Sequence, residues 1–160
     1  VYHSQGDYSY ALEYYLKSLN IRLQVFGETH PDVATSYNNM GVTYYSQGDY
    51  PHALENYSKS LDIYLQVFGE THPNVGTSYN NMGLTYYNQG DYPKALECYS
   101  KALDINERIF GISHPFTTLC YQNIDLIRLK QRSFIQVFRD HYKDLTTIVR
   151  NWVNSILRRV

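Results

Sequence analysis

The chain has 160 residues, a net charge of −1 at neutral pH and an aromatic content of 16%, most of it from 18 tyrosines. This length suffices for one domain with a continuous core that needs neither disulfides nor a metal. Cys98 and Cys120 lie far apart without the spacing of zinc ligands, which indicates reduced thiols. No segment reaches the roughly 18 uninterrupted apolar residues of a membrane span. We therefore expect a cytoplasmic protein without cofactors.

Internal repetition organises the chain. The pair His-Pro begins at residues 30, 72 and 114, so its period is 42 residues. Residues 30–71 and 72–113 are identical at 29 of 42 positions, and both must therefore fold alike. Residues 1–29 correspond to the end of the first helix and to the second helix of an earlier repeat. We divide the chain into this partial repeat, complete repeats over 30–71 and 72–113, and a degenerate terminal repeat over 114–160, together one domain.

Each complete repeat is predicted to be a hairpin of two helices. Pro31 fits a first helical turn, and apolar residues then recur at spacings of three and four. Gly48 suits the turn, Asp49 can cap the second helix, and Gly69 ends it. The pattern predicts helices over 31–47, 50–68, 73–89 and 92–110, and no strands.

Small and aromatic residues recur in each hairpin in one order. They are Tyr37, Met40, Gly41, Tyr44, Ala53, Tyr57 and Ser60, then Tyr79, Met82, Gly83, Tyr86, Ala95, Tyr99 and Ala102. This order resembles the signature of tetratricopeptide repeats, whose ordinary period is 34 residues. The longer period with SYNNMG, GDY and FGETHP resembles the repeats of kinesin light chains. The resemblance implies an all-α fold, a right-handed α-solenoid of antiparallel helical hairpins that serves as a protein–protein interaction scaffold.

The residues that could carry catalysis are better explained by the repetition. His30, His72 and His114 recur one repeat apart, too far for a shared metal, and we interpret them as loop or N-capping residues. Asp49 and Asp91 precede helices, where capping explains them better than acid–base chemistry. No glycine-rich phosphate loop is present. The sequence therefore predicts a protein that is not an enzyme.

A second stripe of residues lies outside the predicted hairpin core. At 100° per residue, Thr35, Asn38, Val42 and Tyr45 fall within about 80° of one another, rotated away from the core positions. The resemblance assigns this stripe to a concave peptide-binding groove. The predicted groove contains Thr35, Asn38, Asn39, Val42, Tyr45, Thr77, Asn80, Asn81, Leu84, Tyr87, Gln122 and Asn123. Its asparagine amides can donate to and accept from a peptide backbone, or they can form a ladder between neighbouring repeats.

The charges of the predicted groove limit its partner. Asp32 is the single charged residue in 31–47 and 73–89, so no cations are available to clamp a carboxylate. We expect a neutral or basic peptide with aromatic residues, and no nucleic acid. The alternative function is a self-assembling array joined through the truncated first repeat and the C-terminal helix.

The C-terminal segment has a different charge from the repeats. Residues 1–127 carry a net charge of −7 and residues 128–160 one of +6. No Gly or Pro follows Pro115, so helix can continue with at most a turn near Arg132. Apolar residues from Leu145 to Val160 keep one helical face. We expect a basic amphipathic capping helix that buries Trp152 and Ile156 near Phe134 and Phe138. Dimerisation and contact with an acidic membrane, aided by Arg150, Arg158 and Arg159, are the other interpretations.

Overall fold

The computed structural model describes residues 5–157, apart from the side chains of residues 5–7 and of several positions after residue 139. It contains six helices within that range: α1 (Gln5–Phe26), α2 (Pro31–Ser46), α3 (Tyr50–Phe68), α4 (Pro73–Gln89), α5 (Tyr92–Phe110) and α6 (Pro115–Leu157). The described residues form no strand. Three of the four predicted hairpin helices have the predicted bounds, and α2 ends one residue early.

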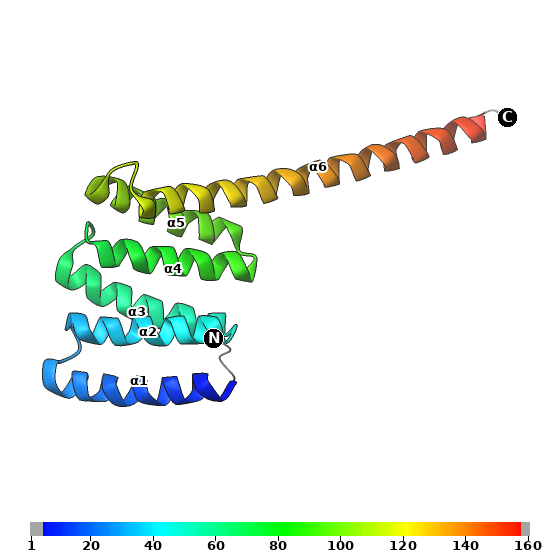
Figure 1. Cartoon of the computed structure of the whole chain (residues 1–160). Helices are drawn as coiled ribbons and strands as arrows, with labels where there is room; N and C mark the ends of the chain where they lie inside the picture. The colour runs from blue at the N-terminus through cyan, green and yellow to red at the C-terminus, as the bar shows by residue number, and fades with distance from the viewer. Residues whose placement is uncertain (1–4, 158–160) are drawn as a thin grey trace. The chain divides into compact units, whose positions relative to one another are not determined.

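Figure 1 shows α1 to α5 stacked in chain order, each antiparallel to the next. Contacts join every consecutive pair of these helices, and α2 also contacts α4, the equivalent helix of the next repeat. This is the arrangement of an α-solenoid of helical hairpins. The chain divides into two compact units, Val1–Ile124 and Asp125–Val160, and the first contains both complete repeats.

Histidine and aspartate caps begin the helices, as predicted. The ring Nδ1 of His30 accepts the Asp32 N–H at 3.2 Å, and His72 makes the same bond with Asn74. Asp49 Oδ1 caps α3 by accepting the His52 N–H at 3.3 Å. Each bond satisfies a backbone donor that has no partner inside its helix. The predicted roles of these residues as caps are confirmed.

Glycine and tyrosine allow the two helices of each hairpin to approach closely. A Cβ atom at Gly41 would lie 2.7 Å from Tyr57 Cδ1, and one at Gly83 would lie 2.9 Å from Tyr99 Cδ1. Both tyrosines are almost completely buried. The core continues through both repeats and consists of Leu19, Val33, Ala34, Met40, Leu61, Ile63, Tyr64, Val75 and Ile105.

The terminal repeat starts as predicted but does not form a hairpin. His114 caps α6 by accepting the Phe116 N–H at 3.3 Å, and Thr117 is buried where the preceding repeat buries Val75. α6 is helical from Pro115 to Leu157, without the turn that the sequence allowed near Arg132. Asp125 and Arg132 stand where the preceding repeat has Gly83 and Gly90. The terminal repeat therefore lacks both glycines on which the earlier hairpin depends.

The predicted cap contact remains a prediction. Phe134 and Phe138 are 72% and 53% exposed and stack on each other with ring centroids 6.4 Å apart. The side chains of Trp152 and Ile156 lie outside the described residues. At the other end, Gly6 and Asp7 are helical, although they align with the turn residues Gly48 and Asp49. The predicted end of an earlier first helix falls on residues 1–4, outside the described range.

Candidate functional site

The candidate site is the face of α2 and α4 that carries the second stripe of residues. Val42 and Leu84 occupy equivalent positions there and are 43% and 37% exposed. Tyr45 and Tyr87, one turn further along each helix, are half-buried. No ionisable side chain other than tyrosine occurs in residues 33–47 or 75–89, so this face combines apolar and neutral polar groups.

Two hydrogen bonds join equivalent parts of the repeats across this face. Asn81 Nδ2 donates to Asn38 Oδ1 at 3.1 Å, and Asn88 Nδ2 donates to the Tyr45 hydroxyl at 2.7 Å. The first bond is the ladder that the sequence left open as an alternative for Asn38. It gives Asn38 Oδ1 one hydrogen-bond donor, so that atom does not need a ligand to be satisfied.

The bond to Tyr45 was not predicted. Asn88 replaces Ser46 of the first repeat, and this substitution is the only sequence signal that could have indicated an interaction between the repeats. Burial raises the pKa of the Tyr45 hydroxyl, and the nearby Tyr50 raises it further, while the Asn88 bond acts in the opposite direction. Tyr45 therefore remains a neutral hydroxyl at physiological pH and can still donate its proton.

The next rung of this ladder is missing. Asn80 and Asn123 are the counterparts of Asn38 and Asn81, yet Asn80 Oδ1 is buried without a hydrogen-bond partner among the described residues. Leaving a buried amide oxygen without a donor costs about 1–3 kcal/mol. The amide pairing between repeats thus stops after one rung.

The other predicted groove residues have different environments. Thr35 Oγ1 lies 3.0 Å from both the Pro31 carbonyl oxygen and the Tyr64 hydroxyl, so it is tied into its own hairpin. Thr77 is exposed and bonds only the Pro73 carbonyl oxygen at 3.1 Å. Asn39 is half-buried. Gln122 is exposed and Asn123 is half-buried, both on the first turns of α6.

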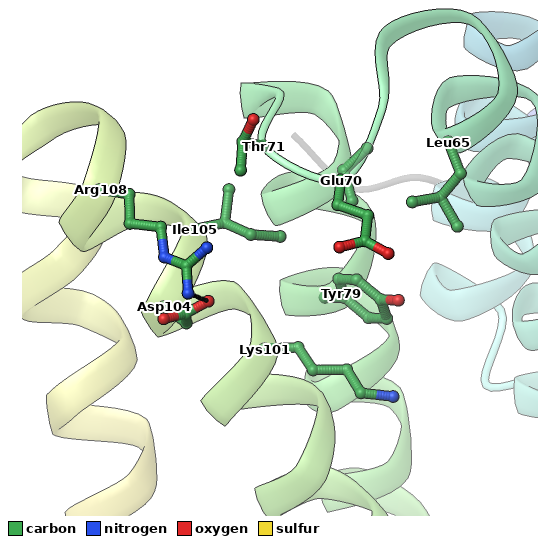
Figure 2. A pocket seen from close by; sticks show the side chains of 9 residues that line it. Leu65, Glu70, Thr71, Tyr79, Lys101, Asp104, Ile105 and Arg108 are labelled. Atoms are coloured by element: carbon green, nitrogen blue, oxygen red, sulfur yellow. Dashed lines mark ion pairs between the residues drawn. The ribbon is translucent and has the colours of Figure 1, made fainter.

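A pocket of about 350 Å³ lies on a different side of α4, beside the loop that follows α3 (Figure 2). Tyr79 in this pocket and Leu84 on the candidate face are about 140° apart around the helix. Most of the charges that line the pocket are paired: Arg108 with Asp104 at 3.0 Å, and Lys101 with Glu97 at 2.7 Å. Oppositely charged side chains that pair on an exposed surface neutralise each other, so they attract a charged ligand only weakly.

The described side chains provide neither a metal site nor a reactive cysteine thiolate. Among residues whose side chains the structure describes, no group of three or more His, Cys, Asp or Glu could hold a metal ion. Burial raises the pKa of the Cys98 thiol to about 11 and raises that of Cys120, so both thiols remain protonated. Within the described residues, no helix is both long enough and apolar enough to cross a membrane.

Comparisons with known proteins agree with this geometry. A family model described as Tetratricopeptide repeat matches residues 1–66, 47–107 and 74–129. Among solved structures, BtubC (BKLC) from P. vanneervenii is 26% identical, with a TM-score of 0.70 over 76% of this chain and 49% of that one. No curated protein matches the chain significantly.

A second similar structure is a putative kinesin light chain from Podosopora anserina with nearly identical TPR-like repeats. It is 18% identical, with a TM-score of 0.68 over 76% of this chain and 58% of that one. A substituted form of that protein gives the same identity and TM-score. The chain spans about half the length of these structures, at 49% to 58%. From its repeat pattern, its stacked hairpins and the family matches across residues 1–129, we conclude that the chain belongs to the tetratricopeptide repeat family, with the fold of its kinesin-light-chain-like type.

Proposed function

We propose that this chain is a protein-interaction module that binds an extended peptide segment along the face of α2 and α4. Tetratricopeptide repeats generally mediate protein–protein interaction or scaffolding. The observation that carries the finer proposal is the pair of exposed apolar side chains, Val42 and Leu84, at equivalent positions of adjacent repeats. Equivalent positions on stacked helices lie roughly 10 Å apart, which is about three residues of an extended chain.

The amides of this face are proposed to bind a peptide mainly through their donors. Asn38 Oδ1 already accepts one bond from Asn81, and Asn80 Oδ1 is buried. No hydrogen bond from the NH₂ groups of Asn38 and Asn80 to another described residue is present, and each group can donate to a backbone carbonyl of an extended ligand. The predicted role of Asn80 is thereby reduced from donor and acceptor to donor alone, whereas Asn38 Oδ1 keeps a second lone pair.

The chemistry of the face favours a ligand that is neutral or basic and contains aromatic residues. An acidic side chain would find no Lys or Arg in residues 33–47 or 75–89. Tyr45 and Tyr87 instead offer aromatic rings with polar tips, which suit aromatic and cationic side chains. Because the groove is uncharged, its affinity for such a ligand should depend little on salt.

A random peptide library displayed on phage tests the proposal and requires no identified partner. We expect the selected peptides to be enriched in aromatic residues and depleted in Asp and Glu. Val42→Glu should weaken their binding by on the order of 1–3 kcal/mol, because it places a carboxylate on the apolar contact. Val67→Glu is the matched control, since Val67 is 41% exposed on α3, outside the α2–α4 face.

Asn38→Asp tests the amide separately. This change removes the NH₂ donor but keeps an oxygen that can accept from Asn81, so the ladder remains. For a neutral selected peptide we expect a loss of about 1 kcal/mol in binding free energy, measured by calorimetry. Equal binding by wild type and Val42→Glu, or selected peptides rich in acidic residues, would reject this face as the site.

A further inference from the structure

From Leu129 onward, the described apolar side chains of the helix in the second unit face solvent. This unit consists of the part of α6 from Asp125 onward, and its described residues contain no second element that could cover it. Ile135, Phe138, Tyr142 and Val149 are each between 52% and 57% exposed. In proteins, most of the stability of a helix comes from packing its apolar face against another part of a structure. We therefore expect this apolar face to pack against a binding partner.

The order of apolar residues along this helix follows a heptad. If Ile135 is assigned to position a, seven consecutive a and d positions are apolar: Ile135, Phe138, Tyr142, Leu145, Val149, Trp152 and Ile156. These 22 positions span three heptads and about 33 Å of helix. A repeat of 3.5 residues drifts by about 20° per heptad around a straight helix, so it faces one partner only when two helices supercoil. This period is typical of a coiled coil.

A shallow depression on the surface of the helix lies at the same positions. Phe138, Arg139, Tyr142 and Lys143 line a shallow depression of about 380 Å³ on this single helix. Phe138, Arg139 and Tyr142 occupy positions d, e and the next a, which are three of the four residues that surround a d-layer knob in a parallel coiled coil. The ring centroids of Phe138 and Tyr142 lie 4.5 Å apart, and both residues line the depression.

We propose that residues 135–156 form a parallel, in-register coiled coil with the same segment of a second copy of this chain. A second copy presents the identical seven positions, and parallel pairing aligns all of them. Antiparallel pairing, which places a opposite d, would leave Ile156 opposite Gln131. No pair of like charges opposes this arrangement, because the g positions hold Phe134, His141, Ile148 and Ser155.

A membrane fits the observations less well than a second copy. An acidic membrane would favour a uniformly basic polar face, whereas Asp140 and Asp144 interrupt the cations of this segment.

The oligomeric state of the full chain tests the proposal. Light scattering after size exclusion should give twice the 18.8 kDa of one chain. Tyr142→Glu with Val149→Glu places carboxylates at two a positions and should return the mass to that of one chain. Val137→Glu with Thr147→Glu adds the same charges at positions c and f and should leave the dimer intact. The thermal transition of the repeats serves as a folding control, because all four positions lie outside residues 1–124.

Crosslinking tests the register. Val149→Cys should form a disulfide-linked dimer under mild oxidation, and Thr147→Cys, on the outer face, should not. Cys98 and Cys120 are buried, so they will not compete for oxidation. A wild-type monomer at every concentration overturns the proposal, as does a monomer that binds phosphatidylserine vesicles through the same a positions. A dimer that fails to crosslink at residue 149 overturns the parallel register.

Discussion

The second complete repeat and the segment after His114 begin alike and end differently. Both start with a histidine cap and a proline, and both bury the residues three and six positions after that histidine: Val75 and Ser78 in α4, Thr117 and Cys120 in α6. After these turns the first segment forms a hairpin, whereas the second continues as one helix to Leu157. Apolar periodicity is therefore sufficient to form the first helix of a repeat, but it does not by itself produce the turn that completes the hairpin.

The difference lies in two glycines with distinct roles. Gly83 lets Tyr99 approach the backbone of α4, where a Cβ atom would be 2.9 Å from the ring. Gly90 adopts a φ of 82°, and the turn it forms brings the Asp91 N–H within 2.9 Å of the Tyr86 carbonyl oxygen. Asp125 and Arg132 provide neither the space nor the left-handed conformation. A helical hairpin in this chain requires both properties.

Placing the terminal residue in the complete repeat should have the largest effect. Gly83→Asp copies Asp125 into a buried contact with Tyr99 and should lower the free energy of unfolding by on the order of 3–5 kcal/mol. Urea denaturation followed by circular dichroism measures it. Leu84→Asp adds the same charge at the next, exposed residue and should cost much less. Similar midpoints for the two variants would mean that Asp125 is not what prevents the third hairpin.

The turn glycine should have an intermediate effect. Gly90→Ala forces an L-residue into the left-handed region and should cost about 1–2 kcal/mol, because the Cβ atom crowds the following carbonyl. Gln89→Ala, one residue earlier at the exposed end of α4, is the control and should be close to neutral. Thermal denaturation monitored at the helical signal compares them. If both variants melt with the wild type, the turn does not depend on the glycine conformation.

Residues that act within one repeat were predictable from the sequence, and those that act between repeats were not. The caps, the turn glycines and the periodic apolar residues predicted the bounds of α3, α4 and α5, because each is a local property. The sequence allowed helix to continue after Pro115 with at most a turn near Arg132, because Asp125 and Arg132 replace both glycines, and α6 is indeed continuous. The Asn88–Tyr45 bond needs the actual offset between stacked helices, which no local pattern contains.

The coupling free energy between the paired asparagines should differ by about 1 kcal/mol between the α2–α4 junction and the α4–α6 junction. A double-mutant cycle with Asn38→Ala and Asn81→Ala should give a coupling free energy of roughly 0.5–1.5 kcal/mol, because their side chains bond at 3.1 Å. The same cycle on Asn80 and Asn123 should give a coupling near zero, since Asn80 Oδ1 has no partner among the described residues. Equal coupling at the two junctions would show that the second rung also forms in solution.

The cap of α5 should produce the smallest difference, and one that depends on pH. The Lys94 ammonium and backbone N–H hold the pKa of the Asp91 carboxyl below its usual value. Stability from such a lowered pKa is fully present above the ordinary value of about 3.9 and is lost as pH falls through the folded-state pKa. Asp91→Ala should therefore lower the melting temperature at neutral pH, and the difference from wild type should shrink in acid. Ser133, the counterpart of Asp91 in the uninterrupted helix α6, caps nothing, so Ser133→Ala should leave the melting temperature unchanged at every pH. A difference for Asp91→Ala that stays constant into acid would assign its effect to helix propensity rather than to the charged cap.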